Sequence, residues 1–255
     1  MSTMFFDSHS HYDDERFDAD RDEILSSMNE NGVSNIINVA SDIPSSYSSV
    51  KIAEKYDFIY ASVGVHPHEV KDMGKSDLEE IRKLSCHEKV VAIGEIGLDY
   101  YYDHSPRDKQ KYWFKKQMDL AYELKLPVII HSRDAMEDTI NICKECKIVG
   151  GIIHCFSGSA ESAKIFLDLG YHISFAGPIT FKNSKNLPKV AEIVPWDRIL
   201  IETDCPYMAP EPHRGKRNSS LFVKHTAEAI AKIKGVDLDF VAKVTGDNAK
   251  RLFSI

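Results

Sequence analysis

Eight short apolar runs rich in β-branched residues recur along the chain, and longer stretches with helical spacing separate them. The predicted strands are "MFFDSH" at the start, 34–40, 58–65, 90–97, 127–132, 150–158, 171–177 and 198–204. Repeated strand–helix units imply parallel strands joined by right-handed crossovers, and eight of them can close into a barrel. The pattern therefore predicts an α/β fold, a single (β/α)8 TIM barrel that spans residues 1–255.

The stretches between the strands are predicted helices. They cover 18–31, 44–56, 76–85, 107–125, 134–146, 159–169 and 219–233, with a short helix at 185–194 and a last one at 237–252. An open doubly wound sheet is the alternative for such an order, but no G-x-G-x-x-G follows the first strand. Because no Gly/Ser-rich linker or low-complexity tract divides the chain, we expect one domain.

The ends of the predicted strands carry a concentration of histidines and acids. In a parallel barrel the active site lies at the C-terminal ends of the strands. In chain order these ends carry His9 and His11, then His66, Glu95, His131, His154 and Asp204. Five of the 11 histidines in the chain would thus meet two acids at one mouth. This placement predicts a functional site there.

Imidazole and carboxylate groups bind divalent transition metals and magnesium, and this set is larger than one catalytic ion needs. We therefore expect two divalent ions, with Glu95 as the carboxylate that bridges them. Two ions about 3.5–4 Å apart can bind a water, lower its pKa and stabilise a displacement. The set predicts a hydrolytic site, in which Asp204 both ligates an ion and accepts a proton as general base.

The segment "FFDSHSHYDD" contains the first two candidate ligands. Strand alternation predicts that Asp7, His9 and His11 share one face, where Asp7 orients its neighbours without binding metal. His66 is expected to contact substrate. Five further histidines are predicted to be surface or packing residues, namely His68, His87, His104, His172 and His225.

Six segments together resemble the TatD family of metal-dependent deoxyribonucleases, within the amidohydrolase-type barrels. They are "DSHSH", "GVHPH", "AIGEIGLDYY", "PVIIHSRDA", "GGIIHCFSGS" and "ILIETDCPYMAPEPHRGKRN". The resemblance runs from about residue 5 to the C-terminal helix, and none of the family's ligand positions is missing from the sequence.

The resemblance implies both a ligand arrangement and a substrate. The implied ligands are His9, His11 and Asp204 for one ion, His131 and His154 for the other, and Glu95 between them. It also implies a Mg²⁺-dependent nuclease that trims DNA, as single strands or from 3′ ends, with RNA as a further substrate in some members. Zn²⁺, Mn²⁺ or Ni²⁺ also fit a histidine and carboxylate site.

A basic loop follows the last predicted strand, in a chain whose net charge is −7. The loop is "PEPHRGKRN" (210–218), and its cations can bind a phosphate backbone, with a solvated basic loop as the alternative. The candidate substrate contacts are His66, Arg133, Ser157, His213, Arg214 and Lys216, with Arg217 also in the loop. Tyr100, Tyr101 and Tyr102 can stack on bases or serve as packing.

Two other functions are open. The same ligands support attack on a carbonyl, so a hydrolase of a small amide, lactone or phosphoester is the second hypothesis. The basic loop argues against it, because a cyclic amide needs no cations beside the metals. A non-catalytic scaffold with a structural metal is the third hypothesis, although such sites are typically closed sets of four ligands.

The sequence also bears on location. No apolar run approaches the roughly 20 residues of a membrane helix, and the N-terminus lacks the order of a signal peptide. Five cysteines, an odd number, favour reduced thiols. Cys143 and Cys146 form a lone C-x-x-C inside a helical pattern, where we expect no redox or zinc role. We expect a cytoplasmic protein without a membrane partner.

Overall fold

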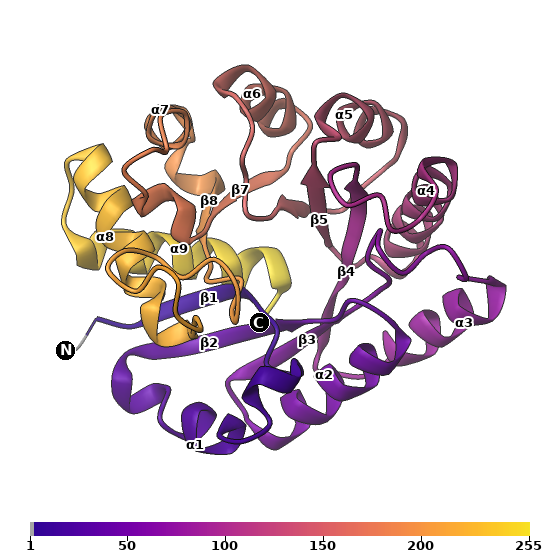
Figure 1. Cartoon of the computed structure of the whole chain (residues 1–255), viewed down its shortest axis with the longest axis horizontal. Coiled ribbons are helices and arrows are strands. Elements are labelled where there is room, and N and C mark those ends of the chain that lie inside the picture. Colours follow the sequence, from indigo (N-terminus) through magenta and orange to yellow (C-terminus); the bar gives the residue numbers. More distant parts are fainter. Residues whose placement is uncertain (1–2) are drawn as a thin grey trace.

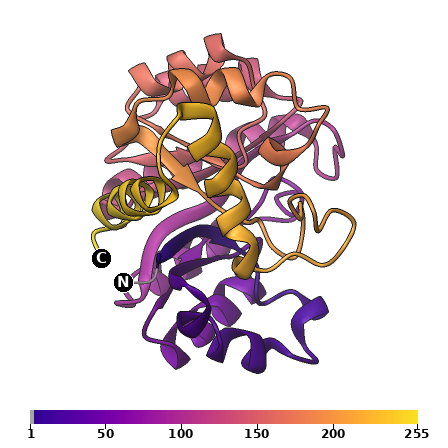
Figure 2. The same ribbon diagram turned by 90° about the vertical axis from the view of Figure 1, so that its left-hand side faces the viewer.

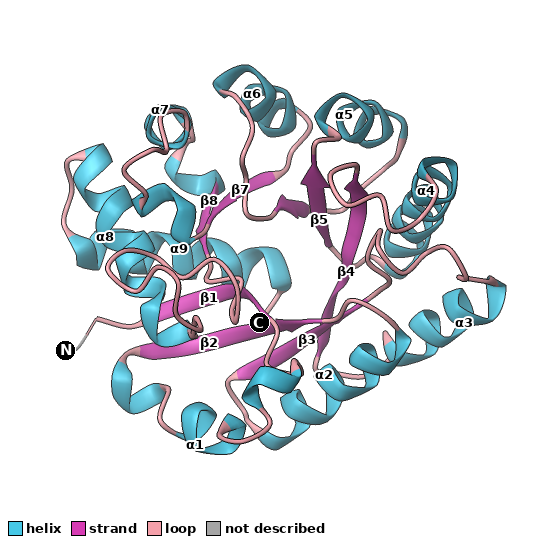
Figure 3. Ribbon diagram, viewed as in Figure 1, coloured by secondary structure: helices cyan, strands magenta, loops and turns pink. Residues whose placement is uncertain are grey.

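The computed structural model describes residues 3–255, and its strands form a ring enclosed by helices (Figure 1, Figure 3). All eight strands run parallel and pair with one another in chain order. They are β1 (Phe5–Ser10), β2 (Val33–Val39), β3 (Ile59–Val63), β4 (Val90–Asp99), β5 (Val128–Arg133), β6 (Gly151–Ile153), β7 (His172–Phe175) and β8 (Ile199–Ile201). The predicted TIM barrel is confirmed.

Helices alternate with the strands along the chain. They are α1 (Arg21–Ser26), α2 (Ile43–Lys55), α3 (Lys75–Leu84), α4 (Arg107–Leu124), α5 (Met136–Glu145), α6 (Ala160–Asp168), α7 (Leu187–Ile193), α8 (Val223–Lys234) and α9 (Leu238–Phe253). Local capping fixes where some of them begin. At α2 the Asp42 carboxylate accepts the Ser45 N–H (2.7 Å), and the Ser45 hydroxyl accepts the Asp42 N–H (2.8 Å). No helix of the described residues is both long and apolar enough to span a bilayer.

The seam between β8 and β1 closes the barrel just beyond β8. There the Asp204 N–H donates to the His9 carbonyl (2.9 Å), and the His11 N–H donates to the Cys205 carbonyl (2.7 Å). These four residues lie at the C-terminal ends of the first and last strands. The loop 202–219, orange in Figure 2, extends outward from this end of the barrel. The first candidate ligands are therefore part of the seam itself.

Apolar side chains fill the interior of the barrel below the strand ends. They come from most of the strands, and α9 adds two more: Phe6, Ile37, Val39, Val91, Ala92, Ile129, Ile152, Leu200, Ala249 and Phe253. The rings of Phe6 and Phe253 stack with centroids 6.3 Å apart, so α9 packs against the start of β1. Full burial of each large aliphatic side chain contributes about 1.5–3 kcal/mol. The polar candidate ligands are thus confined to the opposite, C-terminal end.

Several predicted elements are longer in the sequence pattern than in the structure, and three of them show the reasons. The helix expected at 18–31 is helical only at α1, because its aspartates and asparagines favour turns, and short 3₁₀ turns flank it at Glu15–Phe17 and Asn29–Asn31. The helix expected at 219–233 begins at Val223, because the Ser220 hydroxyl donates to Asp7 and a 3₁₀ turn precedes it. The strand expected at 150–158 ends at Ile153, where the chain turns into the mouth.

Candidate active site

The Glu95 carboxylate lies at the centre of the mouth, with 3% of the residue exposed. Its Oε1 lies 2.7 Å from His154 Nε2 and 2.8 Å from His131 Nδ1. Its Oε2 lies 3.3 Å from His9 Nε2 and 3.7 Å from His11 Nε2. The two carboxylate oxygens therefore face two different histidine pairs.

Asp204 completes the group around His9 and His11. Its Oδ1 lies 3.4 Å from His11 Nε2 and 3.7 Å from His9 Nε2, and the two Nε2 atoms are 3.1 Å apart. A divalent ion with bonds of about 2.0–2.2 Å holds its ligand atoms roughly 3–3.5 Å apart. Several lone-pair atoms converging at such separations fit a bound cation better than they fit one another. The residues present are thus suited to a metal centre.

His66 lies at the edge of the cluster. Its Nε2 is 3.5 Å from Glu95 Oε1, and one ligand atom from each of His66, Glu95 and His131 lies within 4.8 Å of the others. It was expected to contact substrate. This position suits either a third nitrogen on the His131 side or a contact with a bound molecule.

Burial and mutual charge govern protonation in the cluster. Burial opposes ionisation of Glu95, but the surrounding histidines, led by His154, hold its pKa well below the ordinary value. Burial likewise opposes ionisation of Asp204, but the hydrogen bond with His11 lowers its pKa. Burial and the neighbouring His154 lower the pKa of His9. Both acids are therefore charged, and the His9 imidazole keeps a free lone pair.

A carboxylate behind His131 was missed by sequence reasoning. Asp99, buried at the end of β4, lies with Oδ2 3.2 Å from His131 Nε2 and 2.9 Å from His68 Nε2. Such a carboxylate fixes the tautomer and orientation of a ligating histidine. The expectation that His68 is a surface or packing residue is wrong, since it donates to the acid that holds His131. Its place in "GVHPH", two residues after His66, was the available signal.

Glu202 plays the same part for His154 and was also missed. It is fully buried, and its Oε1 accepts from His154 Nδ1 (3.2 Å) and from the Cys155 N–H (2.7 Å). A ligand atom of Glu202 also lies within 4.8 Å of those of His9 and His154. The motif "IETD", which places an acid two residues before Asp204, was the signal for it.

Asp7 does not share a face with His9 and His11, contrary to expectation. Its Oδ1 accepts the Thr203 N–H (2.9 Å), and its Oδ2 accepts from the Thr203 and Ser220 hydroxyls (2.5 Å each). Strand alternation fails because the pairing of β1 with β2 shifts register between Asp7 and Ser10. Burial raises the pKa of Asp7 to about 7, against the hydrogen bonds that lower it. Asp7 therefore joins β1 to the β8 loop and touches no ligand atom of the cluster.

Some side chains of the 210–218 loop already pair or stack within the protein, and others remain open to solvent. Arg217 pairs with the Asp20 carboxylate (2.8 Å), and the His213 ring stacks on Phe222 with centroids 3.9 Å apart. Arg214, which lies over the Phe181 ring at 4.3 Å, and Lys216 are exposed. The last two are the loop cations best placed to meet an anion from solution.

The two other substrate-contact candidates lie beyond β5 and β6. Arg133 ends β5, two residues after His131, and is partly exposed. Ser157 is exposed in the loop after β6, three residues after His154. Both belong to the same rim as the histidine cluster.

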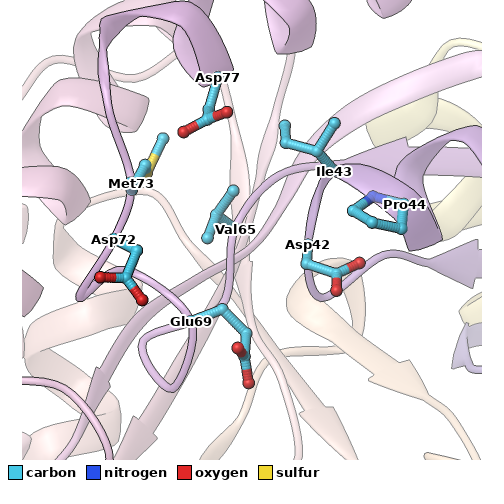
Figure 4. A pocket seen from close by; sticks show the side chains of 8 residues that line it. All are labelled: Asp42, Ile43, Pro44, Val65, Glu69, Asp72, Met73 and Asp77. Atoms are coloured by element: carbon cyan, nitrogen blue, oxygen red, sulfur yellow. The ribbon is translucent and has the colours of Figure 1, made fainter.

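An acidic cavity of about 250 Å³ opens on another part of this rim (Figure 4). It lies between the start of α2 and the loop after β3, and Ile43, Val65 and Met73 contribute apolar surface to it. Its four acids are Asp42, Glu69, Asp72 and Asp77. Four carboxylates in one cavity disfavour the binding of a polyanion there.

Comparisons with known proteins agree with the geometry of the site. A family model described as TatD related DNase matches residues 6–254. YabD of Bacillus subtilis (strain 168), named an uncharacterized metal-dependent hydrolase, is 48% identical over 254 residues, which are 99% of this chain and 100% of the relative. The 3′-5′ ssDNA/RNA exonuclease TatD of Rahnella sp. (strain Y9602) is 34% identical over 94% of each chain. The solved structure of YjjV, a TatD homologue of Escherichia coli K12, is 30% identical and superposes with a TM-score of 0.92 over 98% of each chain.

Proposed function

The chain belongs to the TatD family of metal-dependent hydrolases, and from this membership we propose that it is a nuclease that hydrolyses DNA phosphodiester bonds from the 3′ end of a strand. The observation that carries the proposal is the pair of Glu95 oxygens, each facing its own histidine pair beside a rim that carries exposed cations. The name of the Rahnella relative supports a strand substrate and adds RNA as a second one.

The proposed cofactor is a pair of divalent ions. His9, His11 and Asp204 would hold one, His131 and His154 the other, and Glu95 would bridge them. When bound, such a pair lowers the pKa of a water and offsets the charge of phosphoryl oxygens. We propose Mg²⁺ for activity, and Zn²⁺, Mn²⁺ and Ni²⁺ as ions that the same nitrogen and oxygen donors accept.

The protein's own residues have separate tasks in this proposal. Asp204 takes the proton of the attacking water as the new P–O bond forms and the strand oxygen opposite it leaves. Arg133, Arg214 and Lys216 bind phosphate oxygens and align the strand. Ser157 and His213 are further proposed contacts, and His66 faces the substrate beside Glu95.

A hydrolase of a small amide, lactone or phosphoester is the second candidate, and the plain hydrolase names of relatives such as YabD leave room for it. The ligand set is equally suited to carbonyl attack. The exposed cations at the rim favour the phosphodiester, because a neutral cyclic substrate gains nothing from them.

The deciding experiment incubates metal-stripped protein with 3′- or 5′-labelled single-stranded DNA and with separately added Mg²⁺, Mn²⁺ or Zn²⁺. Stepwise shortening of the 5′-labelled strand in at least one metal is the expected result. A panel of amides, lactones and phosphomonoesters is assayed under the same conditions. Turnover of one of these with intact strands would establish the second candidate instead.

We further propose that residues 1–255 act as one domain in the cytoplasm. All five cysteines are unpaired, which is the arrangement expected in a reducing compartment. Labelling of the five thiols in freshly lysed cells, without added reductant, tests this location.

A further inference from the structure

The loop between β4 and α4 exposes two aromatic rings at the mouth of the barrel. Tyr101 is 58% exposed and Tyr102 is 49% exposed. Tyr100 differs from them, because its hydroxyl donates to Asp138 (2.7 Å) and Arg107 lies over its ring at 4.2 Å. Of these three consecutive tyrosines, two therefore present their rings to solvent and one is packing.

These two rings adjoin the metal centre. The Tyr102 ring lies 5.4 Å from that of His68, which donates to the same Asp99 carboxylate as His131. The Arg133 guanidinium lies over Tyr101 at 4.0 Å and over Tyr102 at 4.8 Å. One cation and two aromatic rings thus lie directly beside the His131 side of the cluster.

Hydrogen bonds fix the loop that carries Tyr101 and Tyr102. Asp99 Oδ1 accepts the N–H groups of Tyr101 (3.0 Å) and Tyr102 (2.9 Å). Farther along the loop, Gln110 donates to the Ser105 carbonyl (2.8 Å), and the Ser105 hydroxyl donates to the His68 carbonyl (2.7 Å). A loop fixed in this way loses little conformational entropy when a ligand binds.

The charges at the rim favour this side for a nucleic acid. The acidic cavity lies beside β3, and Arg133 lies at the end of β5. A strand whose phosphate enters the cluster is therefore electrostatically favoured to pass over the Arg133 side. Exposed aromatic rings next to a cation are the arrangement that binds bases of single strands.

Building on the proposed nuclease function, we propose that Tyr101, Tyr102 and Arg133 form a subsite for one unpaired nucleobase and its phosphate, beside the bond that is cleaved. The base stacks on the outer face of Tyr101, since Arg133 covers the other face. A base inside a duplex is already paired and stacked, so the subsite selects single strands. Every base has a π face, so it does so with little preference for sequence.

The test combines the removal of one base from the strand with the removal of the Tyr101 ring. Strands with one abasic residue at each of the first four positions from the 3′ end are compared with the intact strand. Tyr101→Ala and Tyr101→Leu should lower kcat/KM on the intact strand by about 5- to 100-fold, and Tyr101→Phe should retain it. At one position the abasic residue should impose a similar loss on the parent protein and add none to Tyr101→Ala. Tyr112→Ala, which removes a 50% exposed ring from α4, is the matched control.

If the abasic residue and Tyr101→Ala lowered kcat/KM by independent factors at all four positions, the subsite would be overturned while the nuclease function stood. Equal losses in Tyr101→Phe and Tyr101→Ala would also overturn it, because the ring would then have a role other than stacking. A parent protein that cleaves no strand in any metal would refute the nuclease function, and the subsite with it. The melting midpoint of each variant is measured alongside, and Tyr101→Leu serves if the alanine variant has lost its fold.

Discussion

Replacing Asp99 with asparagine should weaken the half of the metal centre that His131 serves. The carboxylate has both of its oxygens in use, Oδ1 by the N–H groups of Tyr101 and Tyr102 and Oδ2 by His131 and His68. His131 Nδ1 faces Glu95 and must be free of a proton to bind an ion, so its proton lies on Nε2 and is donated to Asp99.

An amide cannot satisfy this arrangement in either orientation. With its oxygen toward the tyrosine N–H groups, its NH₂ group opposes the proton on His131 Nε2. That proton then moves to Nδ1, where it blocks the ion. With the amide reversed, its NH₂ group opposes the two backbone donors. Loss of such a supporting carboxylate typically costs 10–100-fold in metal affinity, or about 1.4–2.7 kcal/mol.

The assay is a calorimetric titration of metal-stripped protein with Mn²⁺ or Zn²⁺ that resolves the two binding events. Asp99→Asn should weaken one event by the stated factor and leave the other close to the parent value. Asp119→Asn, an exposed position on α4, makes the same charge change and is the control. If Asp99→Asn bound both ions with parental affinity, Asp99 would not be setting the tautomer of His131.

Three further outcomes follow from the structure. Asp204→Asn should lower turnover by about 10²–10⁴-fold, and excess ion should not restore it. Excess ion should partly restore turnover in His9→Ala. Parental turnover in Asp204→Asn with both ions bound would exclude Asp204 as the base. The double variant Arg214→Ala, Lys216→Ala should bind single-stranded DNA more weakly, with the salt slope of log K reduced by about 1.4, and an unchanged slope would point away from the loop. Burial and the charge of a neighbouring arginine lower the pKa of His172 to about 4 from 6.5, so the unfolded chain gains a proton first and stability falls as pH drops from about 6.5 to about 4. Between pH 7 and pH 5, the free energy of unfolding measured in urea should therefore fall by about 2 kcal/mol less in His172→Leu than in the parent. Equal decreases would show that His172 does not titrate in this way.

The barrel was predictable because each strand is a short apolar run and each run recurs after a helical stretch. Element ends were less predictable, because they depend on contacts distant in sequence. The segment 18–31 has helical spacing, yet only Leu25 of α1 is fully buried, and its neighbours Phe17 and Met28 pack from turns. Ser220 could extend α8, but its hydroxyl is held by Asp7 across the seam.

The clustering of the candidate ligands at one mouth was predictable because parallel strands bring their C-terminal ends together. The layer behind them was not, since a carboxylate that holds a histidine needs no fixed spacing from it. Asp99 ends β4, the strand beside that of His131, and Glu202 directly follows β8, two strands from β6, which His154 follows; only the folded geometry pairs them. The face of Asp7 was predicted wrongly because a register shift leaves no mark in an alternating pattern.

The seam between the first and last strands makes the site a late product of protein synthesis. His9 and His11 emerge from the ribosome early, but the aspartate and the backbone groups that hold them follow almost the whole chain later, as in the Asp7–Thr203 contact across 196 positions. Contacts so distant in sequence form slowly, because a long loop must close first. A chain released before β8 can contain every histidine of the cluster and still lack Asp204. Abandoned or cleaved fragments that end before β8 should therefore have an incomplete site, because the order of synthesis delays its assembly until nearly the whole chain has been made.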